Sequence, residues 1–187
     1  AFSRVVPYAG AGGLTGECVQ FLARFDLASL PWDGPPRMFA ETKGDPKPAG
    51  KIERVKRSHT RCVLTFEIPG PSGTTARVYV KQCRVRSARK RLASLLVACK
   101  ARREWAAGRE ALRRGVPAAM PLLWAQRRCW GFQQENYLMT LGVEGGVAFA
   151  DFWRGLESEG LRSLWLERLG RFVRQAHDRG VAHDDLN

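Results

Sequence analysis

A strand–turn–strand pattern in the first half of the sequence constrains the fold more than any other feature. Residues 62–68 and 75–81 each have the composition and alternation of a β-strand, and the turn cluster Pro69-Gly70-Pro71-Ser72-Gly73 lies between them. The two runs are therefore expected to pair as an antiparallel hairpin. The alternation of the second run places these residues on its two faces: Ala76, Val78 and Val80 on one, Arg77, Tyr79 and Lys81 on the other.

The hairpin lies within a longer order of strands and helices. Further strands are predicted at residues 52–56, 125–132 and 136–141, with a turn near residues 133–135. Helices are predicted where apolar residues recur at helical spacing, which occurs around Leu92, Leu95, Leu96 and Cys99 and over residues 100–114, 149–156 and 160–179. This order predicts an α+β fold: an antiparallel five-stranded sheet with a packed helix, followed by a helical part.

The same pattern divides the chain into three parts. Residues 1–50 are predicted to be an N-terminal extension with a Pro/Gly-rich connector, because Pro and Gly recur between residues 31 and 50 and interrupt regular structure. Residues 51–141 form the predicted sheet lobe. Residues 142–187 begin with a Gly-containing link and continue into a helical lobe.

The composition favours a soluble, cytoplasmic protein. A chain of 187 residues with 44% hydrophobic content can bury a sizeable core. It has no apolar run long enough to span a membrane and no signal-like N-terminus. The five cysteines are scattered and form no Cys-x-x-Cys pair, which argues for a reducing compartment and against a zinc site.

Positive charge is concentrated in one stretch. The whole chain carries a net charge of +13, and residues 81–114 contain twelve Lys or Arg against only two acids. Such a surface attracts polyanions, which include nucleic acid, anionic lipid headgroups and phosphorylated glycans. The alternative interpretation is a solvated, arginine-rich surface without a partner.

Three acidic or basic residues match the chemistry of phosphoryl transfer. Lys81 closes a predicted strand, where a lysine is often only a solvent-facing edge residue. Glu104 lies early in the following helix, where it could simply pair with Lys100 on the same helix. In kinases, a strand lysine holds the nucleotide phosphates and is held by a glutamate from that helix. The final segment His183-Asp184-Asp185-Leu186 is similar to the kinase catalytic loop, whose Asp acts as the base.

Four segments together resemble the lipopolysaccharide core kinases, the bacterial Kdo/heptose kinases of the protein-kinase-like superfamily. They are VYVKQC around Lys81, KARREWAAGREALRRGVPA around Glu104, NYLMTL before the Gly-containing link, and FVRQAHDRGVAHDDLN. The resemblance covers about residues 51–187 and implies a kinase-like N-lobe followed by the start of a C-lobe. It implies that Lys81 contacts the ATP phosphates, that Glu104 pairs with Lys81, and that Asp185 is the base for a sugar hydroxyl. His183 would brace the loop, and the adenine would lie at the backbone of Thr140 and Leu141.

The resemblance also implies the cofactors, the acceptor and the location. These are ATP and Mg²⁺, an inner-core sugar of lipopolysaccharide or another anionic acceptor, and the cytoplasmic face of the bacterial inner membrane, where the enzyme would be peripheral. A protein kinase or small-molecule kinase of the aminoglycoside type, a pseudokinase, and a basic nucleic-acid-binding module are the alternatives. Nucleic acid is the less favoured partner, because only the charge supports it.

Three departures from the kinase pattern bear on activity. Residues 56–61 stand where a Gly-rich loop is common, and Asp184 replaces the usual arginine before the catalytic Asp. The kinase ligands of Mg²⁺ are an Asn and an Asp downstream of the catalytic Asp, so they are expected beyond Asn187, and no metal ligand is assigned within the sequence. A C-terminally truncated kinase is therefore expected, and residues 1–187 alone are expected to be inactive.

Overall fold

The structure is a computed structural model that describes residues 2–7, 22, 25, 27, 30–33, 49–69, 74–143 and 145–182. The chain forms two compact units. One comprises Ala1–Arg109 with Ala119–Gly142, and the other comprises Glu110–Ala118 with Val143–Asn187. The first unit contains the sheet and the start of the long helix after it; the second contains the end of that helix and two further helices.

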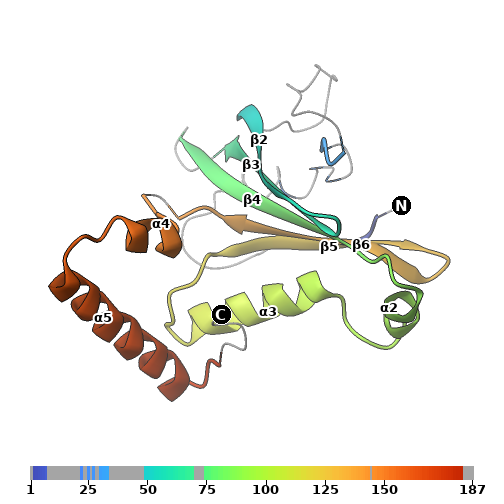
Figure 1. Cartoon of the computed structure of the whole chain (residues 1–187). Helices are drawn as coiled ribbons and strands as arrows, with labels where there is room; N and C mark the ends of the chain where they lie inside the picture. Colours follow the sequence, from blue (N-terminus) through green and yellow to red (C-terminus); the bar gives the residue numbers. More distant parts are fainter. Residues whose placement is uncertain are drawn as a thin grey trace. The chain divides into compact units, whose positions relative to one another are not determined.

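The first unit is built on an antiparallel sheet of six strands (Figure 1). They are β1 Phe2–Pro7, β2 Ala49–Arg57, β3 Arg61–Pro69, β4 Thr75–Arg84, β5 Pro121–Cys129 and β6 Phe132–Leu141, in the spatial order β1-β5-β6-β4-β3-β2. Strands are found at all five predicted places, and the predicted hairpin is confirmed as β3–β4. The sixth strand corrects the prediction, because β1 pairs with β5 and brings residues from the expected extension into the sheet.

One face of the sheet carries the main hydrophobic core. Val78 and Val80 are fully buried on this face of β4, as the alternation predicts. Buried side chains between residues 22 and 32 pack against the same core, namely Leu22, Phe25, Leu27, Leu30 and Trp32. Part of the predicted N-terminal extension is therefore a covering layer of the sheet. Sequence reasoning assigned this segment to an extension because Pro and Gly recur between residues 31 and 50 and interrupt regular structure.

The other face of the sheet is covered by helix α3, Lys100–Arg113. Cys99 and Ala101 at the beginning of the helix pack against Trp124 of β5 and Leu138 of β6. Trp124, Leu138 and Lys81 are direct cross-strand neighbours, so they form one row across this face. The lysine thus lies on the helix-covered face and not at a solvent-facing sheet edge.

The β5–β6 hairpin differs from the prediction in its turn. Cys129 pairs with Phe132, and the two residues between them, Trp130 and Gly131, have φ values of 53° and 79°. Two-residue hairpin turns of this kind need positive φ at both positions, which tryptophan rarely adopts. The predicted turn at residues 133–135 was wrong because Trp130 gives no turn signal. The strand predicted at 125–132 correspondingly begins at Pro121 and ends at Cys129.

A short helix, α2, precedes α3. It spans Ala88–Ala93, earlier than the predicted recurrence of leucines, and Ser94 lies at its end. The Ser94 hydroxyl donates to the carbonyl of Arg91 (2.5 Å) and accepts from the Gln133 amide (3.1 Å), which ends the helix against β6. Leu92, Leu95 and Leu96 remain exposed, with 92% of Leu96 accessible.

The second unit contains helices α4, Phe149–Arg154, and α5, Glu159–Asp178, which agree closely with the predicted helices. Ser158 caps α5 by accepting a bond from the Leu161 amide (3.5 Å). Arg114, at the end of α3, donates to the carbonyls of Arg179 (2.9 Å) and Gly180 (2.8 Å) after α5. The predicted apolar stripe of α5 is present, and none of its residues is buried within the described parts of the chain. Among all the residues that the structure describes, no helix is long and apolar enough to cross a membrane.

Candidate nucleotide site

Lys81 and Glu104 form a close ion pair in the sheet unit. The Lys81 Nζ lies 2.6 Å from Glu104 Oε2 and 2.9 Å from Oε1, so one ammonium meets both carboxylate oxygens. The two side chains are 31% and 29% exposed, which leaves them accessible while part of their solvation is lost. From the sequence alone, Lys81 could also have been a solvent-facing edge residue, and Glu104 could have paired only with Lys100 on its own helix.

The pairing follows from the way helix α3 is attached to the sheet. The side-chain oxygen of Asn136 on β6 accepts a bond from the Ala101 amide (3.2 Å), and its amide nitrogen donates to the Cys83 carbonyl on β4 (3.5 Å). Asn136 is 4% exposed and Ala101 is 1% exposed, so the attachment is buried. It fixes the first turn of α3 over β4 and β6, and Glu104 faces Lys81 one turn later.

Glu104 also has a second cation near it. The Lys100 Nζ lies 3.6 Å from Glu104 Oε1, which is the helical i,i+4 pair that the sequence allowed. In the structure Glu104 therefore pairs with both Lys81 and Lys100. Two ammonium groups share one carboxylate, so the local charge is positive by one unit. Lys81 has three N–H donors, of which the carboxylate can engage two, and the third can bond a ligand oxygen.

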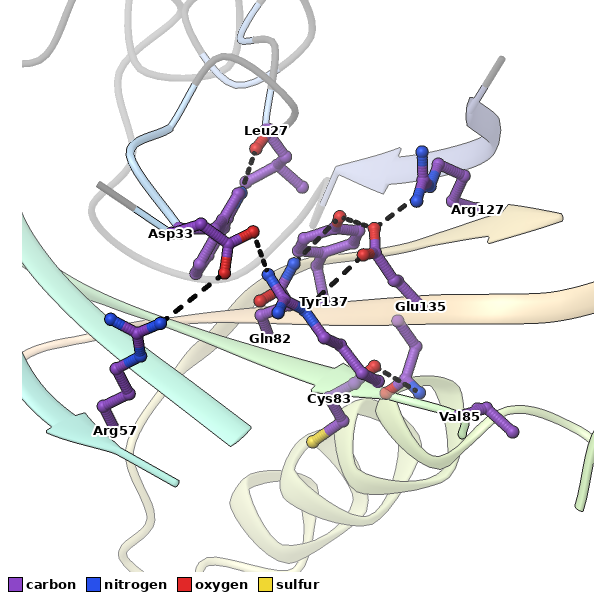
Figure 2. Close-up of polar contacts among 12 residues, drawn as sticks. Leu27, Asp33, Arg57, Gln82, Cys83, Val85, Arg127, Glu135 and Tyr137 are labelled. Atoms are coloured by element: carbon purple, nitrogen blue, oxygen red, sulfur yellow. Dashed lines mark hydrogen bonds and ion pairs between the residues drawn. The ribbon is translucent and has the colours of Figure 1, made fainter. Parts of the chain in front are cut away.

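Cys83 lies two residues beyond Lys81 on the same face of β4. Burial raises the pKa of its thiol, and the nearby Lys81 ammonium partly opposes that effect. The thiol is therefore held in the neutral form at physiological pH. Figure 2 shows Cys83 on the other side of the strand from Gln82, which belongs to the core face.

Thr140 and Leu141 lie at the end of β6, beside Tyr79 and Val78 of β4. The Leu141 amide donates to the Met120 carbonyl (2.8 Å), and the Gly142 amide donates to the Arg77 carbonyl (2.7 Å). A Cβ on Gly142 would lie 3.0 Å from the Arg77 carbonyl oxygen, so a larger residue would require the backbone to shift by a few tenths of an ångström. The backbone N–H groups of Leu141 and Gly142 therefore already donate within the protein.

The predicted catalytic segment stays a prediction. His183, Asp184 and Asp185 lie outside the described residues. Within the described residues, no group of three or more His, Cys, Asp or Glu side chains could hold a metal ion. In the short loop after β2, the Ser58 hydroxyl accepts the Arg61 amide (3.2 Å), and the Ser58 amide donates to the Arg61 carbonyl (2.7 Å).

A polar cluster on the core face of the sheet was missed by sequence reasoning (Figure 2). Arg84 donates to Asp33 (2.6 Å) and lies 3.7 Å from Glu135. Glu135 also pairs with Arg127 (3.0 Å) and accepts a bond from the buried Tyr137 hydroxyl (2.5 Å). Burial and the bond to Glu135 raise the pKa of Tyr137, so the phenol stays protonated. The cluster ties the N-terminal segment to the sheet, and Arg84, counted with the basic surface, has a structural role.

A comparison with protein families matches most of the chain to a family model. The model of the lipopolysaccharide kinase (Kdo/WaaP) family matches residues 49–187, which is well over half of the chain. A search of curated proteins and a search of solved structures found no match. The family match begins at the first residue of β2 and covers both residues of the ion pair and the segment that contains Asp185.

Proposed function

The chain belongs to the lipopolysaccharide kinase (Kdo/WaaP) family, and we propose that it transfers a phosphoryl group from ATP to a sugar hydroxyl of the lipopolysaccharide inner core. Membership of the family implies a phosphotransferase that uses ATP and Mg²⁺ and takes a lipopolysaccharide acceptor. The antiparallel sheet with its packed helix is consistent with a kinase-like N-lobe. We propose that the residues from 143 onward begin the helical C-lobe.

The Lys81–Glu104 ion pair is the observation that carries the proposal. A phosphate oxygen needs a fixed cation, and Glu104 holds the Lys81 ammonium in one position with bonds of 2.6 and 2.9 Å. The residues fit ATP, because the pair retains partial exposure and excess positive charge. ATP supplies the transferred phosphoryl group, and Mg²⁺ neutralises charge that develops on it. Lys81 would orient the phosphates.

The other roles in the proposal rest on the family match. Asp185 would accept the proton of the sugar hydroxyl, since an Asp in this loop is the base in kinases. Thr140 and Leu141 would contact the adenine through backbone groups. Because the Leu141 amide already donates to Met120, its carbonyl is the group that we assign to the adenine amino group.

The test separates nucleotide binding from chemistry. Lys81→Met should weaken ATP binding by about 10- to 100-fold, because a charge-assisted contact to phosphate is lost. Glu104→Gln should weaken it less, and Lys51→Met, an exposed lysine on β2, serves as the matched control. Asp185→Asn should leave ATP binding intact but reduce transfer to purified lipopolysaccharide by about 10²–10⁴-fold. Unchanged ATP affinity in Lys81→Met would contradict the nucleotide site.

We also propose that the protein acts at the anionic cytoplasmic face of the bacterial inner membrane. The support is the exposed leucines of α2 and the following turn, Leu92, Leu95 and Leu96, which lie beside the exposed cations Arg89 and Lys90. Leu92→Ser/Leu96→Ser should reduce sedimentation with phosphatidylglycerol vesicles at low salt, whereas Leu161→Ser on α5 should not. Equal sedimentation of the wild type with neutral vesicles would contradict the proposal.

A further inference from the structure

A cavity of about 550 Å³ lies between the ends of β3 and β4, helix α2 and the first turn of α3. Its lining includes the thiol-bearing Cys83 and six cationic residues: Arg61, Arg84, Arg86, Lys90, Lys100 and Arg103. Of these, Arg84 already pairs with Asp33. None of the lining residues in this described part of the chain is acidic. The cavity lies within the sheet unit, and neither Lys81 nor Glu104 lines it.

Most of the positive charge around this cavity is not neutralised by the protein. Lys100 shares Glu104 with Lys81 at 3.6 Å, and Arg86 bonds a ring nitrogen of His59, not a carboxylate, at 2.7 Å. Arg61, Lys90 and Arg103 are exposed and form no ion pair with a carboxylate among the described residues. Cations gathered in this way repel one another, which lowers stability unless an anion joins them.

The first turn of α3 adds to this positive potential. The N-terminal end of a helix is itself positive, and acidic side chains are favourable there. The first turn of α3 contains no acid and carries Lys100, Arg102 and Arg103 instead. The placement is unfavourable for an isolated helix by a few tenths of a kcal/mol or more for each cation. Binding of an anion would reverse the sign of this contribution.

We propose that the cavity binds the phosphate group of a phosphorylated small molecule or lipid headgroup. Arg61 and Arg103 offer planar guanidinium groups suited to two-point contact with phosphate, and Lys90 offers a compact point charge. The volume is in the range of small-molecule sites and exceeds what one phosphate ion needs. The side chains of Ala93, Val97 and Ala98 provide an apolar wall for the rest of the ligand.

This site is separate from the proposed nucleotide site, and the inference does not rest on the proposed function. Lys100 is the one residue shared by the two places, because it lines the cavity and lies near Glu104. If a bound phosphate attracted Lys100 away from Glu104, the Glu104 carboxylate would pair with Lys81 only. Occupancy of the cavity would then strengthen the ion pair that we assign to ATP.

The test uses inorganic pyrophosphate as the probe and isothermal titration calorimetry as the measurement. Lys90→Gln/Arg103→Gln removes two exposed cations of the cavity, and Lys51→Gln/Lys56→Gln removes two exposed cations of β2 as the matched control. We expect affinity to fall at least about tenfold in the first variant and less than about twofold in the second, because direct contacts outweigh screened ones. Equal losses in both variants, or unchanged affinity in the first, would overturn the proposal.

Two further measurements locate the bound probe. Lys81→Met should retain pyrophosphate affinity; a larger loss there than in the cavity variant would place the probe at the nucleotide site and overturn the inference. Pyrophosphate should also slow alkylation of Cys83, which lines the cavity, relative to the exposed Cys129. Labelling of Cys83 at the same relative rate with and without pyrophosphate would contradict binding in the cavity.

Competition distinguishes the two sources of phosphate. Vesicles of phosphatidylcholine with phosphatidic acid should displace pyrophosphate if the natural ligand is a lipid headgroup. Glycerol 3-phosphate, and not the vesicles, should displace it if the ligand is a soluble phosphate ester. Either result supports the proposal, whereas displacement by neither competitor would show that the cavity does not take a phosphate monoester.

Discussion

At the scale of single residues, Asp33 shows how a side chain outside the family match supports the sheet. Its carboxylate accepts a bond from Arg84 (2.6 Å) and lies 3.8 Å from Arg57. These contacts hold the pKa of Asp33 below its ordinary value of 3.8, and the bond to Arg84 is the main cause. The side chain is 67% exposed, so solvent screens the pair and its contribution is about 0.2–1 kcal/mol.

Asp33→Asn should therefore lower the free energy of unfolding at neutral pH and have no effect in acid. The folded-state pKa lies below the unfolded-state pKa, so the stabilisation is complete above about pH 4 and is lost as pH falls through the folded-state value. Urea unfolding at pH 7 and pH 3 measures the difference. Glu157→Gln, on an exposed residue without an ion pair among the described residues, is the control. If the difference in unfolding free energy between Asp33→Asn and the wild type were larger at pH 3 than at pH 7, the lowered pKa would not be the source of the stabilisation.

At the scale of elements, the turn of the β5–β6 hairpin places a tryptophan in a backbone conformation that this residue rarely adopts. Trp130 has a φ of 53° and is 92% exposed, so it accepts an unfavourable conformation without packing against the core. A position of this kind in a two-residue hairpin turn favours Asn or Gly. The cost of tryptophan here is offset by the paired strands on either side.

Trp130→Asn should raise the free energy of unfolding by up to about 1 kcal/mol, because asparagine tolerates positive φ. Trp130→Val should lower it, since a β-branched side chain adopts this conformation least well. Thermal unfolding of the two variants beside the wild type measures both effects. The same direction of change in both variants would mean that the indole, and not the backbone, determines stability at this position.

At the scale of the molecule, the family match and the folded unit begin at different places. The match starts at residue 49, yet the core of the sheet includes five buried side chains before it, Leu22, Phe25, Leu27, Leu30 and Trp32. The Trp32 ring also packs on Tyr137 at 5.4 Å and donates to the Leu27 carbonyl at 2.9 Å. The segment before residue 49 therefore completes the sheet that holds Lys81.

A protein shortened to residues 49–187 should not fold cooperatively. Loss of five buried apolar side chains removes roughly 1.5–3 kcal/mol each, which together reaches the usual stability of a whole domain. Soluble yield and urea unfolding followed by circular dichroism measure the outcome. In the chain of residues 1–187, Trp32→Ala should lower the free energy of unfolding by about 3–5 kcal/mol. If the shortened protein unfolded cooperatively at the same midpoint urea concentration as the wild type, the residues before 49 would not be needed for the core.

Local patterns in the sequence were sufficient for the elements that carry the proposed chemistry. The alternation in residues 75–81 predicted both the β4 strand and the face of Lys81, because a strand places every second side chain on the same side. The helical spacing after residue 100 predicted α3. The family resemblance, carried by the segments around these residues, is confirmed by the match to residues 49–187.

Features that depend on contacts between distant residues were decided only by the tertiary structure. The pairing of β1, the packing of the core residues before residue 33 and the Asp33–Arg84–Glu135 cluster could not be predicted locally, since each depends on partners far along the chain. The cationic cavity likewise joins side chains from β3, α2 and α3. Composition predicted an excess of positive charge in residues 81–114. Only the folded structure shows that Arg84 pairs with carboxylates whereas Arg61, Lys90 and Arg103 pair with none among the described residues, because such pairing depends on distance in space.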